Sequence, residues 1–135
     1  LIGRPTAERV KIALGNALRP EASDAVVKGR CLALGVPRAA TLQGEEIHRA
    51  LIPAVQAIGA AIRRTLENVP PEIGSDIVDH GIVLTGAGAR LAGLDLALRD
   101  ATGLPVVVAE NPELAVVAGA RRLLDQLDVK RERVT

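Results

Sequence analysis

The first half of the chain shows two patterns of apolar residues, one with a helical period and one typical of short strands. Apolar residues recur every three or four positions over 5–18 and predict a helix. Two β-prone stretches, about 25–32 and 38–42, flank a turn that contains glycine and proline, which predicts a hairpin. The longest periodic segment, 44–69, predicts a core-facing helix.

The second half of the chain alternates strand and helix signals. A turn and a short helix over 70–80 precede an apolar run at 81–85, and a second apolar run follows at 105–110. Both runs are typical of buried parallel strands. The segments 91–102 and 111–127 have helical periods. This β-α-β-α order predicts an α/β fold with a parallel sheet. The sheet is small for this many helices, so the fold is expected to be incomplete.

Composition and charge narrow the classes of function. Of 135 residues, 48% are apolar and 24% are charged, which is typical of a globular domain. The 17 basic and 16 acidic residues give a net charge of +1, so no nucleic-acid partner is expected. No apolar run reaches about 18 residues, so no transmembrane segment is expected. The single Cys31 cannot form an internal disulfide, which favours a cytoplasmic location.

The segment GIVLTGAGARLAGL, residues 81–94, carries the clearest candidate chemistry. A glycine-rich turn between a strand and a helix can cradle phosphate with its backbone N–H groups. Gly86 and Gly88 would serve a plain strand-to-helix turn equally well. Glu8 and Lys11, three residues apart, lie on one helical face and form either part of a binding site or a solvated ion pair. The residues alone leave both alternatives open.

Other reactive side chains are isolated along the chain. His48 and His80 have no cysteine or carboxylate at metal-ligand spacing, so no metal site is expected. Cys31 has no base nearby and is expected to be a buried apolar thiol. Four acidic residues share one short segment and mark either a solvated surface or a partner contact: Glu67, Glu72, Asp76 and Asp79.

Three segments together resemble the bacterial actins of the MreB and MamK type. They are IGRPTAERVKIALGNA, VKGRCLALGVPRAATLQGEEIHRAL and the stretch from ENVPPEIGSDIVDHGIVLTGAGARL to AENPELAVVAGARRLL. Their order and spacing fit the C-terminal half of that family along nearly all 135 residues. The resemblance implies one half of an actin-like fold, an α/β architecture in which parallel strands and helices carry a small β-hairpin subdomain.

The resemblance also divides the chain and implies a nucleotide site. Residues 1–43 would form the upper actin-like subdomain and residues 44–135 the lower one. ATP or ADP with Mg²⁺ would be the cofactor of an intact site. The residues implied at the ribose and adenine are Glu8, Lys11 and Gly15. Those implied in the adenosine-side loop are Gly86, Ala87 and Gly88.

Two departures from the family pattern lower the expected activity. Family members commonly carry a third glycine where this chain has Ala87, whose methyl group would crowd the ligand or forbid a positive φ. The Asp-x-Gly-Gly-Gly-Thr phosphate hairpin and the acidic residues that hold Mg²⁺ have no counterpart in the chain. The chain is therefore expected to be a truncated actin-like domain that is not an enzyme and binds no cofactor in isolation.

The expected role is that of a cytoskeletal interaction module. Its partner would be a bacterial actin filament or a second copy, contacted through the hairpin or the acidic segment, as the family resemblance implies. An open sheet edge offers another contact, because an incomplete sheet exposes an unpaired strand. Its expected location is cytoplasmic, beside a filament near the inner or magnetosome membrane. The alternative is the nucleotide-binding half of an MreB- or MamK-type ATPase, which polymerises when its N-terminal half is present.

Overall fold

The computed structural model of the chain describes residues 1–132, and its elements follow the predicted order. Helix α1 (Arg4–Leu14) has a proline in its first turn. Backbone N–H groups there have no partner within the helix, so the missing N–H of proline costs no hydrogen bond. Strands β1 (Asp24–Arg30) and β2 (Pro37–Gln43) pair antiparallel along their full length. Gly35, in the turn between them, has a φ of +70°. The predicted hairpin is confirmed.

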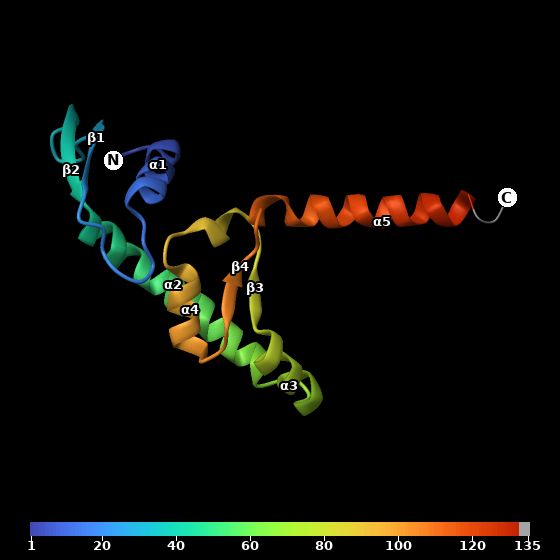
Figure 1. Ribbon diagram of the computed structural model, residues 1–135. Coiled ribbons are helices and arrows are strands. Elements are labelled where there is room, and N and C mark those ends of the chain that lie inside the picture. Colours follow the sequence, from blue (N-terminus) through green and yellow to red (C-terminus); the bar gives the residue numbers. More distant parts are fainter. Residues whose placement is uncertain (133–135) are drawn as a thin grey trace.

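A single long helix connects the two halves of the molecule. Helix α2 (Gly44–Leu66) starts with a capping box, in which the N–H of Gln43 donates to the carboxylate of Glu46 at 3.0 Å. The helix continues through Pro53 and leads from the hairpin to α3 (Pro71–His80) (Figure 1). The hairpin and α3 therefore lie at opposite ends of α2.

The second half of the chain contains the predicted β-α-β unit. Strands β3 (Ile82–Leu84) and β4 (Val106–Val108) pair in parallel, and α4 (Leu94–Thr102) connects them. Helix α4 ends at Gly103, which takes the left-handed conformation with a φ of +72°. A 3₁₀ turn, η1 (Ala87–Arg90), comes before α4, so this helix begins later than predicted.

Two small clusters of buried apolar side chains make up the core. The first joins α1 to the hairpin and the start of α2, and the second joins α4 to β4 and the second half of α2. Gly59 of α2 lets α4 approach closely, because a Cβ there would lie 3.2 Å from the Cβ of Ala101. Buried members of the first cluster are Val10, Leu14 and Val27. Buried members of the second are Ala17, Leu94, Leu98 and Val106.

Two expectations about burial are wrong. The parallel strands are not buried on both faces, since Val83 is 58% exposed and Val107 is 52% exposed. Helices α2 and α4 pack on one face of this two-stranded sheet, and the other face is open. The apolar stripe of α2 is also only partly covered, since Ala50 is exposed and Ile58 is 44% exposed.

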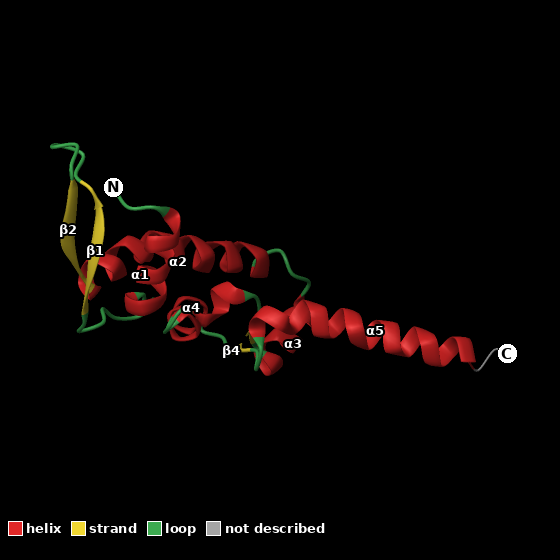
Figure 2. Cartoon of the chain, turned by 90° about the horizontal axis from the view of Figure 1, so that it is seen from above, coloured by secondary structure: helices red, strands yellow, loops and turns green. Residues whose placement is uncertain are grey.

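Helix α5 (Ala115–Glu132) stands away from the rest of the molecule (Figures 1 and 2). The short 3₁₀ turn η2 (Pro112–Leu114) leads into it. The helix extends beyond its predicted end near residue 127. Its predicted apolar stripe is present but uncovered, because Val117 is 67% exposed and Leu123 is 63% exposed.

Candidate functional site

The glycine-rich turn leaves β3 in a conformation that glycine adopts far more readily than other residues. Gly86 has a φ of +83° and a ψ of 164°, so a side chain there would be strained. Ala87 begins η1, and its φ is not positive. All described residues with a positive φ are glycines. The expectation that the Ala87 methyl group conflicts with a required positive φ is therefore wrong. That requirement falls on Gly86.

The same turn contains backbone N–H groups that have no backbone acceptor within the described chain. The N–H of Gly86 donates to the carbonyl oxygen of Pro112 at 2.6 Å, which fixes the turn against η2. Within the described chain, the N–H groups of Ala87 and Gly88 have no backbone acceptor. A Cβ built on Gly86 or Gly88 would meet no atom within 4 Å. Ala87 and Gly88 are exposed, so the turn has two N–H groups without a backbone acceptor at the surface, and such groups can bind an anion.

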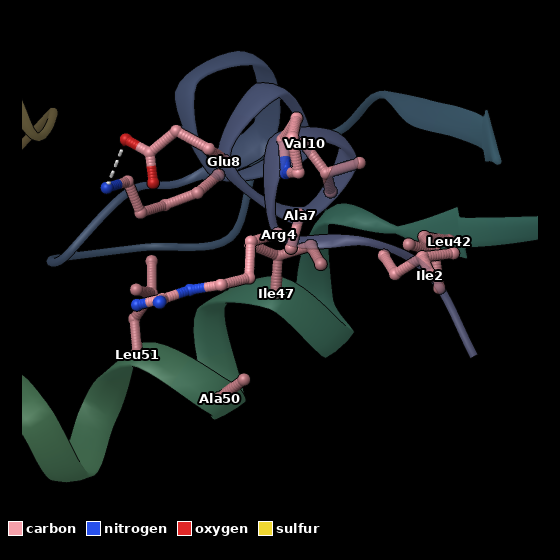
Figure 3. A pocket seen from close by; sticks show the side chains of 11 residues that line it. Ile2, Arg4, Ala7, Glu8, Val10, Leu42, Ile47, Ala50 and Leu51 are labelled. Atoms are coloured by element: carbon pink, nitrogen blue, oxygen red, sulfur yellow. Dashed lines mark ion pairs between the residues drawn. The ribbon is translucent and has the colours of Figure 1, made fainter.

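Glu8 and Lys11 form an exposed ion pair on α1. Their charged atoms are 2.7 Å apart, and the two side chains are 58% and 43% exposed, respectively. Both border an apolar groove of about 610 Å³ between α1 and the first turns of α2, where Ala50 and Leu51 line the opposite wall (Figure 3). No residue of the glycine-rich turn lines this groove, so the groove does not unite the predicted site residues.

Gly15 is buried where α1 ends. Its N–H donates to the carbonyl oxygen of Lys11 at 2.8 Å, and a Cβ on it would clash with that oxygen. The same Cβ would lie 3.2 Å from Cδ1 of Leu91, just beyond η1. The chain leaves the helix after Leu14, rather than near residue 18 as predicted, and turns toward this segment. Gly15 therefore has a packing role at the contact.

Asn16 joins the two groups of predicted site residues, although no sequence pattern singled it out. It is 8% exposed and forms a parallel bridge with Ala92. The end of α1 and the segment that follows Gly88 are therefore in direct contact. The available signal was an asparagine placed between the end of a helix and Pro20, since asparagine side chains commonly cap turns.

Arg90 and Glu113 form a second contact that sequence spacing did not reveal. Nε of Arg90 donates to Oε2 of Glu113 at 2.8 Å, and Nη2 donates to Oε1 at 2.6 Å. This bidentate pair connects η1 to η2. Hydrogen bonds from Arg90 hold the pKa of Glu113 below its ordinary value, and the same bonds raise the pKa of Arg90.

The remaining reactive side chains do not form a site. The thiol of Cys31 is partly exposed at the hairpin turn, not buried as predicted, and backbone hydrogen bonds from Leu34 and Ala33 lower its pKa. Within the described part of the chain, no group of three His, Cys, Asp or Glu side chains is placed to hold a metal ion. None of the described helices combines the length and apolarity needed to cross a bilayer.

Comparison with known sequences identifies close relatives. The family model for MreB/Mbl protein matches residues 1–132. The cell shape-determining protein MreB of Escherichia coli strain K12 is 46% identical over 130 residues, which cover 96% of this chain and 38% of that protein. The corresponding Mbl of Bacillus subtilis strain 168 is 40% identical over 130 residues, which cover 95% and 39%. The chain therefore spans less than two fifths of the length of these relatives.

Comparison with solved structures supports the same relationship. MreB5 of Spiroplasma citri bound to ADP superposes with a TM-score of 0.90 at 30% sequence identity, covering 97% of this chain and 40% of that one. A non-polymerising mutant of MamK superposes with a TM-score of 0.60 at 22% identity, which supports the fold alone. The predicted partial actin-like α/β fold is confirmed. The chain belongs to the MreB/Mbl family of actin-like cytoskeletal proteins.

Proposed function

We propose that the chain is a cytoskeletal interaction module that associates with copies of itself, or with a filament of its longer relatives, through its two ends. The observation that carries this proposal is the separation of charge along the molecule. The hairpin end is basic and the α3 end is acidic, and each end also exposes apolar side chains.

The hairpin end combines positive charge with an apolar tip. Residues 25–43 contain no Asp or Glu, and their three basic residues, Lys28, Arg30 and Arg38, are all exposed. The turn between β1 and β2 adds exposed apolar side chains. These are Leu32, which is 73% exposed, Leu34, which is 63% exposed, and Val36, which is 49% exposed.

The α3 end has the opposite charge. Residues 67–80 contain no Lys or Arg, and their acidic side chains are all exposed. Ile73 and Val78 lie among them and are 52% and 60% exposed. The 23 residues of α2 separate this end from the hairpin by roughly 35 Å. The acidic residues are Glu67, Glu72, Asp76 and Asp79.

Complementary ends on one molecule favour contact between the head of one copy and the tail of the next. Opposite charges orient the two surfaces, and burial of their apolar side chains stabilises the contact. The two contacting surfaces differ, so each added copy leaves one end of each kind free. Repeated contacts of this kind extend as an open chain, unless the rotation between copies closes them into a ring.

Sedimentation velocity tests this proposal directly. We expect wild-type protein to form species larger than a monomer at about 50 mM salt and to dissociate toward monomers at about 500 mM, because screening weakens exposed charge pairs. We also expect the chain to co-sediment with filaments of full-length Escherichia coli MreB. A monomer under all these conditions that stays in the supernatant would contradict the proposal.

A second candidate function is nucleotide binding. It is supported by the N–H groups of exposed Ala87 and Gly88, which have no backbone acceptor, and by similarity to MreB5, which was solved bound to ADP and to AMPPNP. Glu8 and Lys11 would contact the adenosine, as the family resemblance implies. The described residues supply no carboxylate cluster for Mg²⁺. The proposed activity is therefore binding of ADP or ATP without hydrolysis.

Calorimetric titration with ADP tests this second function. Lys11→Ala is expected to weaken binding, whereas Arg9→Ala, on another face of the same exposed helix, is expected to bind as the wild type does. No heat with wild-type protein would exclude nucleotide binding by this chain. Equal affinity of the wild type and Lys11→Ala would exclude the predicted site.

A further inference from the structure

The side chain of Asn16 is buried and makes three hydrogen bonds. Its Oδ1 accepts the N–H of Leu18 at 3.0 Å and the N–H of Arg19 at 3.2 Å. Its Nδ2 donates to Oε1 of Glu21 at 2.9 Å. These three bonds hold the segment that follows α1 in one turn, because asparagine caps the backbone N–H groups two and three residues ahead.

The backbone around Asn16 ties this turn to two other parts of the molecule. Nδ1 of His48 donates to the carbonyl oxygen of Asn16 at 2.8 Å, which fixes the turn to α2. The N–H of Ala17 donates to the carbonyl oxygen of Ala92 at 2.7 Å. Gly93 also fits closely here, because a Cβ on it would lie 2.7 Å from Oδ1 of Asn16. The turn is therefore held to both α2 and the segment between η1 and α4.

The two groups of predicted nucleotide contacts lie on either side of this junction. Helix α1, with Glu8 and Lys11, comes just before Asn16, and Ala92 follows Gly88 by four residues. The buried side chains of α1 belong to one core cluster and those of α4 to the other. Both clusters pack on α2, which couples them indirectly, and the Asn16 turn adds a direct hydrogen-bonded contact between the end of α1 and the segment that follows the glycine-rich turn.

We propose that Asn16 is a positioning residue that sets the placement of α1 relative to the glycine-rich turn. Its consequence for ligand affinity rests on the second candidate function, nucleotide binding. Its effect on the spacing of α1 and the glycine-rich turn does not depend on nucleotide binding. Either prediction can therefore fail without the other.

An exchange of donor and acceptor isolates the role of the side chain. Asn16→Asp places a carboxylate against that of Glu21, which removes the donated hydrogen bond and adds repulsion. The double variant Asn16→Asp with Glu21→Gln reverses donor and acceptor and has the same net charge as the wild type. Asn16→Ala removes all three side-chain bonds. We expect the two single variants to loosen the junction and the double variant to restore it.

Distance measurement between spin labels tests the proposal. Labels at Ile12→Cys and Ala87→Cys, in a Cys31→Ser background, report the spacing of α1 and the turn. We expect a narrow distribution in the wild type and the double variant, and a broad one in Asn16→Asp and Asn16→Ala. Amide exchange at Ala17 is expected to be about tenfold faster in these single variants. An unchanged distribution in both single variants would overturn the proposal.

Titration with ADP separates the two claims. Where the wild type binds ADP, Asn16→Asp is expected to bind it about tenfold more weakly and the double variant to recover, since misplaced contacts lose affinity. Full affinity in Asn16→Asp would overturn the link to the ligand site. No ADP binding by the wild type, with broadened distances in the single variants, would exclude nucleotide binding and support the positioning role. If Asn16→Ala does not fold, the distance distributions of Asn16→Asp and the double variant test the proposal.

Discussion

Two glycines set the limits of β3. Gly81, before the strand, has a φ of +74° and a ψ of −162°, and Gly86, after it, has a φ of +83° and a ψ of 164°. Residues with side chains rarely adopt either combination. A Cβ on Gly81 would also lie 2.5 Å from the carbonyl oxygen of Pro105, whereas a Cβ on Gly86 meets no atom within 4 Å. Substitution is therefore strained at both positions, with an added clash at Gly81.

Gly81→Ala is expected to lower the free energy of unfolding by about 1–3 kcal/mol, because of backbone strain and the clash with Pro105. Gly74→Ala is the matched control. Gly74 lies inside α3, has no positive φ and would place its Cβ in open space, so alanine is expected to stabilise by up to about 1 kcal/mol. Urea denaturation measures both changes. Equal effects of the two substitutions would contradict the strain and clash assigned to a side chain at Gly81.

Ala87→Gly is expected to lower stability by up to about 1 kcal/mol and to give no gain in ADP affinity from backbone relaxation. The reason is that Ala87 has no positive φ, so glycine relieves no strain and adds only conformational freedom to the unfolded chain. Urea denaturation and calorimetry measure the two effects. A large gain in affinity would indicate that the methyl group itself crowds the ligand.

The residues of the candidate site differ in how far the sequence could predict them. The glycine-rich turn was predictable, because a strand signal, glycines and a helix signal follow one another along the chain. The importance of Asn16 was not, because it depends on contacts with His48 and Ala92, which are distant in sequence. The roles of Glu8 and Lys11 at a nucleotide stay a prediction.

At the scale of elements, the Arg90–Glu113 pair joins η1 to η2 and makes that junction sensitive to pH. Because the pKa of Glu113 is lowered in the folded state, its contribution is fully present above the ordinary glutamate pKa and is lost as pH falls through the lowered value. We expect Glu113→Gln to have a lower Tm than the wild type at about pH 7 and a smaller difference in Tm at about pH 3, where the glutamate begins to protonate. A difference that is the same at both pH values would contradict this assignment.

The order and pairing of the elements were predictable, but their burial and their ends were not. Periodicity predicted the hairpin and the parallel strands, since each depends on residues close in sequence or on the β-α-β order. Burial of β3 depends on which helices cover each face, and only one face is covered. The end of α1 depends on packing of Gly15 against Leu91, so helical periodicity placed it several residues too late.

At the scale of the whole molecule, the chain shares its arrangement with a relative of which it covers 40%. The superposition includes 97% of this chain, although α5 and one face of the β3–β4 sheet are uncovered here. Family membership was predictable because three long segments carried the resemblance in order. The division into subdomains 1–43 and 44–135 stays a prediction. The separation of basic and acidic ends required the structure, since it depends on the direction of α2 (Figure 1).

Sedimentation of charge-swapped variants tests the central claim, contact between oppositely charged ends, most directly. One variant carries Arg30→Glu and Arg38→Glu in the hairpin, and the other carries Glu72→Lys, Asp76→Lys and Asp79→Lys in α3, which reverses the net charge of that end. Each variant alone has two ends of like charge and is expected to stay monomeric at low salt, whereas an equal mixture is expected to assemble as the wild type does. Arg121→Glu with Arg122→Glu, on exposed α5, is the control expected to assemble normally. Assembly of either variant alone, or no assembly of the mixture while the wild type assembles, would contradict the account.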